Sequence, residues 1–170
     1  MVPILTRDTL DFISRSTAQT ERIGMRLAQF LRPGDVICLA GALGAGKTCL
    51  VRGIGRGLGV QGDVTSPTFV LVREHPVPGT DLYLYHIDLY RITSPQEALA
   101  LGMEEYLYGN GICAIEWPER AQEVLPPERL WITLDHIGEN QRTVTITAMG
   151  ARYRELLAQL KKNAFGLGGL

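Results

Sequence analysis

The sequence has few of the residues that build disulfide frameworks or zinc sites. Its three cysteines, Cys38, Cys49 and Cys113, form an odd set without Cys-x-x-Cys spacing, and its three histidines lie far apart. Such a set predicts neither a disulfide-stapled fold nor a structural zinc site. Two of the cysteines lie in apolar, strand-like runs, where cysteine usually packs as a small hydrophobic residue. We therefore expect a reduced, cytoplasmic protein.

Long apolar runs and an excess of one charge are missing as well. No run approaches the length that spans a bilayer, and the N-terminus has no basic segment followed by an apolar one. We therefore expect no association with a membrane. The 17 basic and 18 acidic residues leave a formal net charge of −1, which provides no overall attraction to nucleic acid but is compatible with a local basic patch.

What is present fits one globular domain of 170 residues, large enough to bury a core. Hydrophobic residues make up 45% of the chain and charged residues 21%, which fits neither disorder nor a fibrous repeat. No linker, internal repeat or low-complexity segment interrupts the sequence before its glycine-rich end. We expect a single domain over residues 1–170, with residues 163–170 as a frayed tail.

Residues 41–48, Gly-Ala-Leu-Gly-Ala-Gly-Lys-Thr, fit the phosphate-binding loop of P-loop nucleotidases. Glycines leave no side chain between backbone N–H groups and a polyphosphate, and the N-terminus of a following helix attracts the same anion. Lys47 can reach the β- and γ-phosphates, and the hydroxyl of Thr48 can bind Mg2+. We expect the nucleotide to contact this loop and its immediate flank, namely Gly41, Ala42, Leu43, Gly44, Ala45, Gly46, Lys47, Thr48 and Cys49.

The flanks of this loop favour the functional interpretation. An apolar run of strand length, residues 35–40, precedes the loop, and residues 48–58 carry apolar side chains at helical spacing. Strand, glycine loop and helix in this order are the context in which the motif binds phosphate. The alternative is a glycine-rich turn with an exposed lysine, which requires neither flank.

A first carboxylate is expected at the end of a strand. Residues 81–90 alternate between two faces, and His86 and Asp88 share one of them near the carboxyl end. Site residues of open α/β sheets often lie at that end. Asp88 can orient a water molecule or hold Mg2+, so we expect it to be a catalytic residue. An edge strand whose polar end meets solvent is the structural alternative.

A second carboxylate follows a buried run. Residues 111–116 are small or apolar until they end in Glu116, which predicts a parallel strand with an acid at its tip. This is the form of a Walker B element, whose acid holds Mg2+ directly or through water. We expect Trp117 beside it to lie in the core, with a nucleotide-stacking plate and a partner contact as alternatives.

The loop over residues 64–69 follows the P-loop helix and carries several hydroxyl groups. It can therefore reach the γ-phosphate side, as switch loops do. A plain turn held by its Ser and Thr side chains fits these residues equally well.

The rest of the chain alternates between helices and strands. A capping box at residues 16–19 predicts the start of a first helix, whose apolar face carries Ile23, Leu27, Phe30 and Leu31. Two further helices are expected, one over 94–107 with an interruption near Gly102 and one over 151–162. The expected strands include 9–13, 68–73 and an antiparallel pair over 130–135 and 142–147. Together these elements predict an α/β P-loop NTPase fold, with a mixed, mostly parallel central sheet flanked by helices and antiparallel strands at the edge.

Four motifs, in order, resemble the TsaE (YjeE) family of small bacterial P-loop ATPases. They are the loop at residues 41–48, Ser-Pro-Thr-Phe at 66–69, His-x-Asp-Leu-Tyr-Arg at 86–91 and Glu-Trp-Pro at 116–118. The resemblance implies an ATPase, with ATP and Mg2+ as cofactors, that serves threonylcarbamoylation of adenosine 37 in tRNA. It also implies TsaB and TsaD, as a heterodimer, as the partners, with tRNA reached only indirectly.

The resemblance also implies roles for single residues. Lys47 would hold the phosphates, Thr48 and Glu116 would hold Mg2+, and Asp88 would assist hydrolysis. The segments 66–69 and 116–120 would act as switch-like loops, and Trp117 would lie at the nucleotide or the partner surface. The start of the first helix borders the adenine in this family, which nominates Ser16 and Thr17.

Two positions depart from the family's usual loop, Gly-Asp-Leu-Gly-Ala-Gly-Lys-Thr-Thr. Ala42 stands where the family has an acid, and Cys49 replaces the second hydroxyl with a weaker donor. The Gly, Lys and Thr residues of the motif are intact, so we expect nucleotide binding to persist. Two other functions remain open: a small-molecule P-loop kinase, for which no Arg-rich lid segment is apparent, and a nucleotide-gated binding module with little hydrolysis.

Overall fold

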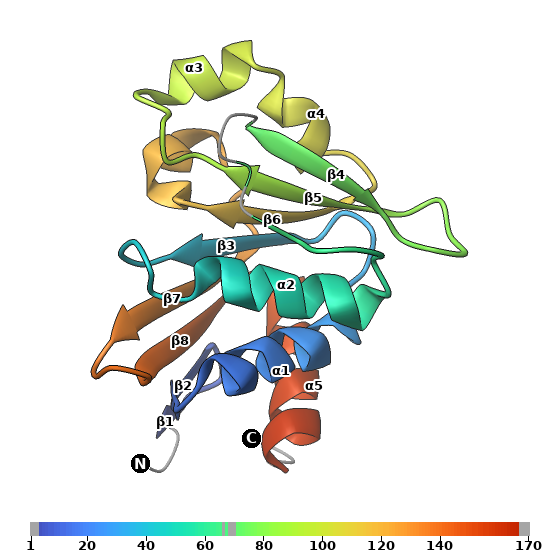
Figure 1. The fold of residues 1–170 in the computed structure, drawn as a ribbon. Helices are drawn as coiled ribbons and strands as arrows, with labels where there is room; N and C mark the ends of the chain where they lie inside the picture. The colour runs from blue at the N-terminus through green and yellow to red at the C-terminus, as the bar shows by residue number, and fades with distance from the viewer. Residues whose placement is uncertain (1–3, 66, 68–70, 167–170) are drawn as a thin grey trace.

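A computed structural model describes residues 4–65, 67 and 71–166 of the chain, and its eight strands form one mixed sheet (Figure 1). The strand order is β1-β2-β8-β7-β3-β6-β5-β4. Neighbours run parallel in the middle, through β7 (Arg129–His136), β3 (Val36–Ala40), β6 (Ile112–Glu116) and β5 (Tyr83–Asp88). The flanks are antiparallel, with β1 (Ile4–Leu5), β2 (Thr9–Ser14) and β8 (Arg142–Met149) on one side and β4 (Val72–Pro76) on the other. The predicted mixed sheet is confirmed.

Helices cover both faces of the sheet, which explains why β3 is apolar at nearly every position. Ile37 and Leu39 join a core with α1 (Thr17–Ala28), α2 (Lys47–Leu58) and α5 (Ala151–Phe165). Val36 and Cys38 point to the other core, with α3 (Pro95–Ala100), α4 (Met103–Leu107) and the 3-10 helix η1 (Pro118–Val124). The first four of the five β3 side chains are at most 2% exposed, as expected of a central parallel strand.

Glycines let α1 and α2 approach each other closely where they lie side by side in Figure 1. A Cβ atom on Gly24 of α1 would overlap the carbonyl oxygen of Leu50, and one on Gly53 of α2 would overlap that of Glu21. The backbone of one helix therefore occupies the space that a side chain of the other would need. This contact fixes the position of α2, whose first turn follows the P-loop.

The helix ends differ from those expected. The first helix ends at Ala28, so Phe30 and Leu31 follow it as half-buried residues rather than continuing its apolar face. The last helix reaches Phe165, whose ring lies 5.0 Å from that of Phe12, so residues 163–165 are helical instead of frayed. Residues 167–170 lie outside the described residues. In the described part of the chain, no helix combines the length and the apolar character needed to cross a bilayer.

The predicted helix over residues 94–107 and the predicted strand over residues 68–73 differ in how closely they match the structure. The helix over residues 94–107 is interrupted as expected, because Gly102 adopts a φ of 81° between α3 and α4. Of the strand expected at residues 68–73, the described residues place Val72 and Arg73 in β4 (Val72–Pro76), which forms an antiparallel hairpin with β5. Ser66, Thr68 and Phe69 of the expected switch loop, and residues 68–70 of the expected strand, lie outside the described residues.

Candidate nucleotide-binding site

The P-loop joins the end of β3 to the start of α2 and depends on glycine geometry. Gly41, Gly44 and Gly46 have φ values of 144°, 78° and 108°, in the region that other residues rarely adopt. Gly46 is also the residue before the first turn of α2, and a Cβ atom there would overlap Nη1 of Arg142. The loop therefore turns sharply without Cβ atoms at these three positions, which leaves backbone N–H groups accessible to a phosphate.

Lys47 lies folded across this loop. Its Nζ donates hydrogen bonds to the carbonyl oxygens of Gly41 at 2.5 Å and Ala42 at 2.8 Å, and it lies 4.3 Å from the centroid of a Trp117 ring. The side chain is only 4% exposed. Burial lowers the pKa of Lys47, and the carboxylate of Glu116 is the strongest of three that oppose this. A cation held by neutral carbonyl groups is ready to exchange them for anionic oxygens.

Glu116 and Thr48 meet at the base of the pocket. The Thr48 hydroxyl donates to the carboxylate of Glu116, at 3.0 Å from Oε1 and 3.1 Å from Oε2. Nε2 of His86 lies 2.5 Å from Oε2, and both residues of this pair are buried, with 0% and 3% exposure for His86 and Glu116. The carboxylate is therefore held from two sides. The sequence patterns link Thr48 with Glu116 and place His86 beside Asp88 at a strand end, but they do not predict the contact between His86 and Glu116.

Asp88 lies beside Glu116 because the two residues are register neighbours on β5 and β6. Its Oδ1 accepts a hydrogen bond from the backbone N–H of Tyr90 at 2.9 Å, and its side chain is half-buried at the wall of the pocket. The two acids predicted at strand tips are thus adjacent. This placement suits a carboxylate that acts on the same ligand as Glu116.

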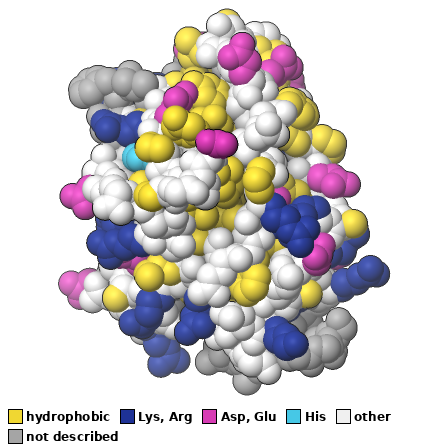
Figure 2. Space-filling model, turned by 90° about the vertical axis from the view of Figure 1, so that its right-hand side faces the viewer, with side chains coloured by type: hydrophobic (Ala, Val, Ile, Leu, Met, Phe, Trp, Pro, Cys, Tyr) yellow, Lys and Arg dark blue, Asp and Glu magenta, His cyan; other side chains and the backbone are white. Residues whose placement is uncertain are grey.

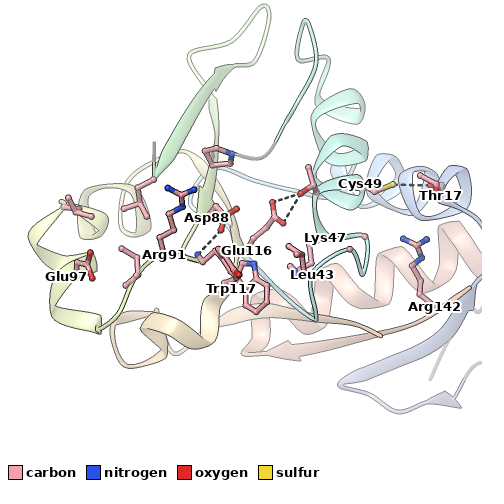
Figure 3. A pocket seen from close by; sticks show the side chains of 18 residues that line it. Thr17, Leu43, Lys47, Cys49, Asp88, Arg91, Glu97, Glu116, Trp117 and Arg142 are labelled. Atoms are coloured by element: carbon pink, nitrogen blue, oxygen red, sulfur yellow. Dashed lines mark hydrogen bonds between the residues drawn. The ribbon is translucent and has the colours of Figure 1, made fainter. Parts of the chain in front are cut away.

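These residues surround a cavity of about 800 Å3 (Figure 3). It runs from Thr17 and Arg142 at one end, past the P-loop, to Glu97 on α3 at the other. Most of the predicted site residues line it: Thr17, Leu43, Gly44, Gly46, Lys47, Thr48, Cys49, Asp88, Glu116 and Trp117. Sequence alone did not indicate the far wall, which includes Leu71, Ile92 and Leu101.

Four predicted nucleotide contacts are not on the cavity wall. Ser16 instead caps α1, because its side chain accepts a hydrogen bond from the backbone N–H of Gln19 at 3.1 Å. Ala45 is fully buried, and Gly41 and Ala42 turn their carbonyl groups to Lys47. Of the two residues nominated at the start of the first helix, Thr17 lines the cavity and Ser16 does not; the carbonyl oxygen of Thr17 accepts a hydrogen bond from the thiol of Cys49 at 3.3 Å.

Trp117 lies partly in the core and partly at the pocket. It packs against the core that contains Cys38 and also lines the cavity, with its ring 5.0 Å from that of Tyr90. Its φ of 58° makes it the one non-glycine residue in the described ranges with a left-handed backbone. Such strain often marks functional sites. Trp117 therefore lies against the core, as expected, and also on the cavity wall, where the alternative of a nucleotide contact stays a prediction.

Two residues that the sequence patterns did not indicate approach the loop from β7 and β8. Nη1 of Arg142 donates to the carbonyl oxygen of Ala45 at 3.2 Å, and Nε2 of His136 lies 2.5 Å from that of Gly44. A signal for Arg142 was present, because it falls in phase with Val144 and the other inward, apolar positions of β8. An arginine in an apolar phase points to a buried charge.

The donor set suits Mg2+ better than a transition metal. The part of the chain that the structure describes has no group of three or more His, Cys, Asp or Glu side chains able to hold a metal. Mg2+ instead takes one or two protein oxygens and completes its shell with water and substrate phosphates. The hydroxyl and carboxylate of Thr48 and Glu116, already in contact, fit that requirement.

A glycine loop between a parallel strand and a helix, with a buried carboxylate at the end of the strand beside it in the sheet, defines the class of P-loop nucleotide-binding folds. The sequence profile of the family described as threonylcarbamoyl adenosine biosynthesis protein TsaE matches residues 14–144. This chain therefore belongs to the TsaE family.

Individual relatives agree with this assignment. TsaE of Bacillus subtilis is 42% identical over 145 residues, which cover 85% of this chain and 89% of the relative. TsaE of Treponema pallidum is 42% identical over 134 residues, which cover 79% of this chain and 97% of the relative. The crystal structure of YdiB from Bacillus subtilis superposes with a TM-score of 0.80 at 36% identity, covering 92% of this chain and 96% of YdiB.

Proposed function

We propose that this protein is a Mg2+-dependent ATPase that acts, in the cytoplasm, in the threonylcarbamoyl modification of adenosine 37 in tRNA. Its relatives carry the name of that pathway. The observation that carries the ATPase assignment is the convergence of Lys47, Thr48 and Glu116 at the P-loop, where two cation ligands touch and the lysine faces the cradle.

The residues divide the work of phosphate binding. Lys47 exchanges its two carbonyl partners for oxygens of the β- and γ-phosphates. Thr48 and Glu116 hold Mg2+, which when bound neutralises the charge of the phosphate oxygens. His86 keeps the carboxylate of Glu116 in its position, since it lies 2.5 Å from Oε2 in a fully buried environment.

Asp88 is proposed to orient the attacking water, because it is the register neighbour of Glu116 and lines the same cavity. Trp117, beside Lys47, is proposed as the residue that couples nucleotide to the segment 116–120. Trp117 has a left-handed backbone, which the contacts around it hold in place, and its ring packs against Tyr90. Because Lys47 lies over the same ring, a movement of Lys47 toward the phosphates would change how the ring packs. This segment and residues 66–69 are the proposed switch loops.

TsaB and TsaD, as a heterodimer, are the proposed partners. The rim of the pocket carries apolar side chains that are strongly exposed, with Leu43 at 77%, Leu101 at 55% and Tyr90 at 47%. Such a rim suits protein contact. Contact with tRNA is proposed to be indirect, because a direct interface would need a concentrated basic patch. The face in Figure 2 lies at the opposite end of the strands from the P-loop, and its Lys and Arg side chains are spread among acidic and apolar ones.

A second candidate, a small-molecule kinase, is favoured by one observation. The cavity continues beyond Asp88 to Glu97, which leaves room for an acceptor on the far side of the phosphates. The test is to incubate the protein with ATP labelled on its γ-phosphate and a mixture of nucleosides and small acceptors. We expect the label to appear as inorganic phosphate. Label on an organic acceptor would establish the kinase, and bound ATP without turnover, even with the TsaB–TsaD pair, would establish a gated binding module.

A further inference from the structure

Arg142 is a buried cation at the rear of the P-loop. It opens β8 and is 5% exposed, and its Nη1 donates to the carbonyl oxygen of Ala45 at 3.2 Å. Nη1 also fills the space beside Gly46 that a Cβ atom would occupy. Its side chain borders the cavity together with Gly46, Cys49 and Thr17, at the end away from α3 (Figure 3).

The charge of Arg142 has no carboxylate partner within ion-pair distance among the residues that the structure describes. Its Nε is buried without a hydrogen-bond acceptor in that same part of the chain. Some other arginines of the fold are neutralised: Arg152 donates two hydrogen bonds to the carboxylate of Asp35, and Arg56 pairs with Glu21 near the same helices. Arg129 is buried without such a partner in the described ranges too, but it lies at the other end of β7 and does not line the cavity. A guanidinium stays protonated in proteins, so its burial without an anion is unfavourable.

The strand next to β8 holds the same loop. His136 is the register neighbour of Arg142, and its Nε2 lies 2.5 Å from the carbonyl oxygen of Gly44. The side chains at the end of the β7–β8 pair therefore contact two successive carbonyl oxygens of the P-loop, those of Gly44 and Ala45. Arg142 thus combines a fixed position against the loop with an uncompensated positive charge.

We propose that Arg142 is a second cation of the phosphate site, which attracts the polyphosphate of a nucleoside di- or triphosphate through its charge and holds the Ala45–Gly46 turn in shape. It complements Lys47 from the opposite side of the loop backbone. The inference rests on the proposed binding of nucleotide at the P-loop. It identifies Arg142 as a positioning residue, since it acts on the ligand from behind the loop.

The test compares Arg142→Gln and Arg142→Lys by calorimetric binding of ATP, ADP and AMP. Arg142→Gln should weaken ATP binding about tenfold, which corresponds to about 1.4 kcal/mol, and should weaken AMP binding much less, because AMP carries less phosphate charge. Arg142→Lys should retain most of the ATP affinity. Raising the salt concentration should reduce the difference between the wild type and Arg142→Gln.

Arg129→Gln is the matched control. Arg129 is also a buried arginine, 7% exposed, and donates to the carbonyl oxygen of Pro126 at 2.8 Å, but it lies at the other end of β7 from the P-loop. This variant should lose stability without any preference among the three nucleotides. It therefore separates the effect of removing a buried arginine from the effect of removing charge at the phosphates.

Equal loss of ATP and AMP affinity in Arg142→Gln, or unchanged ATP affinity, would overturn the inference. If Arg142→Gln does not fold, Arg142→Lys decides alone, because a purely structural role would weaken all three ligands alike. A wild-type protein that binds none of the nucleotides would instead refute the proposed function, and with it this inference. Normal wild-type binding with charge-independent variants would refute the inference only.

Discussion

Replacing Glu116 separates its structural contribution from its role toward Mg2+. In Glu116→Ala, the hydroxyl of Thr48 and Nε2 of His86 both lose their acceptor. Thr48 is half-buried and can turn to water, but His86 is 0% exposed and already has Nδ1 without a hydrogen-bond partner among the described residues. An unsatisfied buried polar group costs about 1–3 kcal/mol.

Removing the buried carboxylate offsets part of that cost, so we expect Glu116→Ala to lower the free energy of unfolding by about 2 kcal/mol. In a protein of 170 residues this corresponds to a decrease in Tm of about 4–8 °C. Glu116→Gln keeps the size and a carbonyl acceptor, and should lose about 1 kcal/mol or less. It still removes the negative charge that Mg2+ needs.

Thermal unfolding with ATP, in the presence and absence of Mg2+, is the assay. Saturating ligand at about 100 times its Kd stabilises a protein by about 2.7 kcal/mol, so the shift in Tm reports binding. Wild-type protein should gain more from ATP with Mg2+ than from ATP alone, and Glu116→Gln should gain equally from both. An undiminished Mg2+ effect in Glu116→Gln, or an unchanged Tm in Glu116→Ala, would refute this reasoning.

The remaining predictions address other parts of the site. Lys47→Met should abolish ATP binding without destabilising the free protein, and titration with ATP measures this; normal affinity would contradict the P-loop assignment. Because burial lowers the pKa of Lys47, the unfolded chain binds more protons between that lowered pKa and the ordinary value of 10.5, so wild-type stability should rise with pH there relative to Lys47→Met. Asp88→Asn should bind ATP normally and hydrolyse it at least about tenfold more slowly, since positioned proton acceptors contribute at least that much; equal turnover would leave Asp88 a structural role. Gly53→Ala should destabilise by about 1–3 kcal/mol because its Cβ overlaps the backbone of Glu21, and chemical denaturation should detect it; Gly138→Ala, where the new Cβ would meet its nearest atom at 3.9 Å and no positive φ is involved, is the control for loss of a glycine alone.

Local sequence patterns predicted the parts of the fold and site that depend on neighbouring residues. The P-loop and the strand that ends in Glu116 are read from short runs, and parallel pairing then brings Glu116 and Asp88 together. Ser16 was predicted correctly as a helix cap, and that role explains why it does not line the cavity.

The remainder depends on contacts between distant segments, which no local pattern contains. Arg142 reaches the loop only because β8 pairs with β7 and β7 pairs with β3, so its position is a property of the strand order. His86 acquires a partner through the pairing of β5 with β6. The extension of the last helix to Phe165 likewise depends on a tertiary contact, with Phe12 on β2. Tertiary packing decides such features more strongly than propensity does.

The most direct test of the proposed function is the rate of ATP hydrolysis by the purified protein, measured alone and with the cognate TsaB–TsaD pair. We predict slow hydrolysis alone and strong stimulation by the pair; Lys47→Met should abolish the stimulated rate and Asp88→Asn should lower it at least about tenfold. A rate that the pair does not change, with a functional pair and bound ATP, would contradict a partner-dependent ATPase.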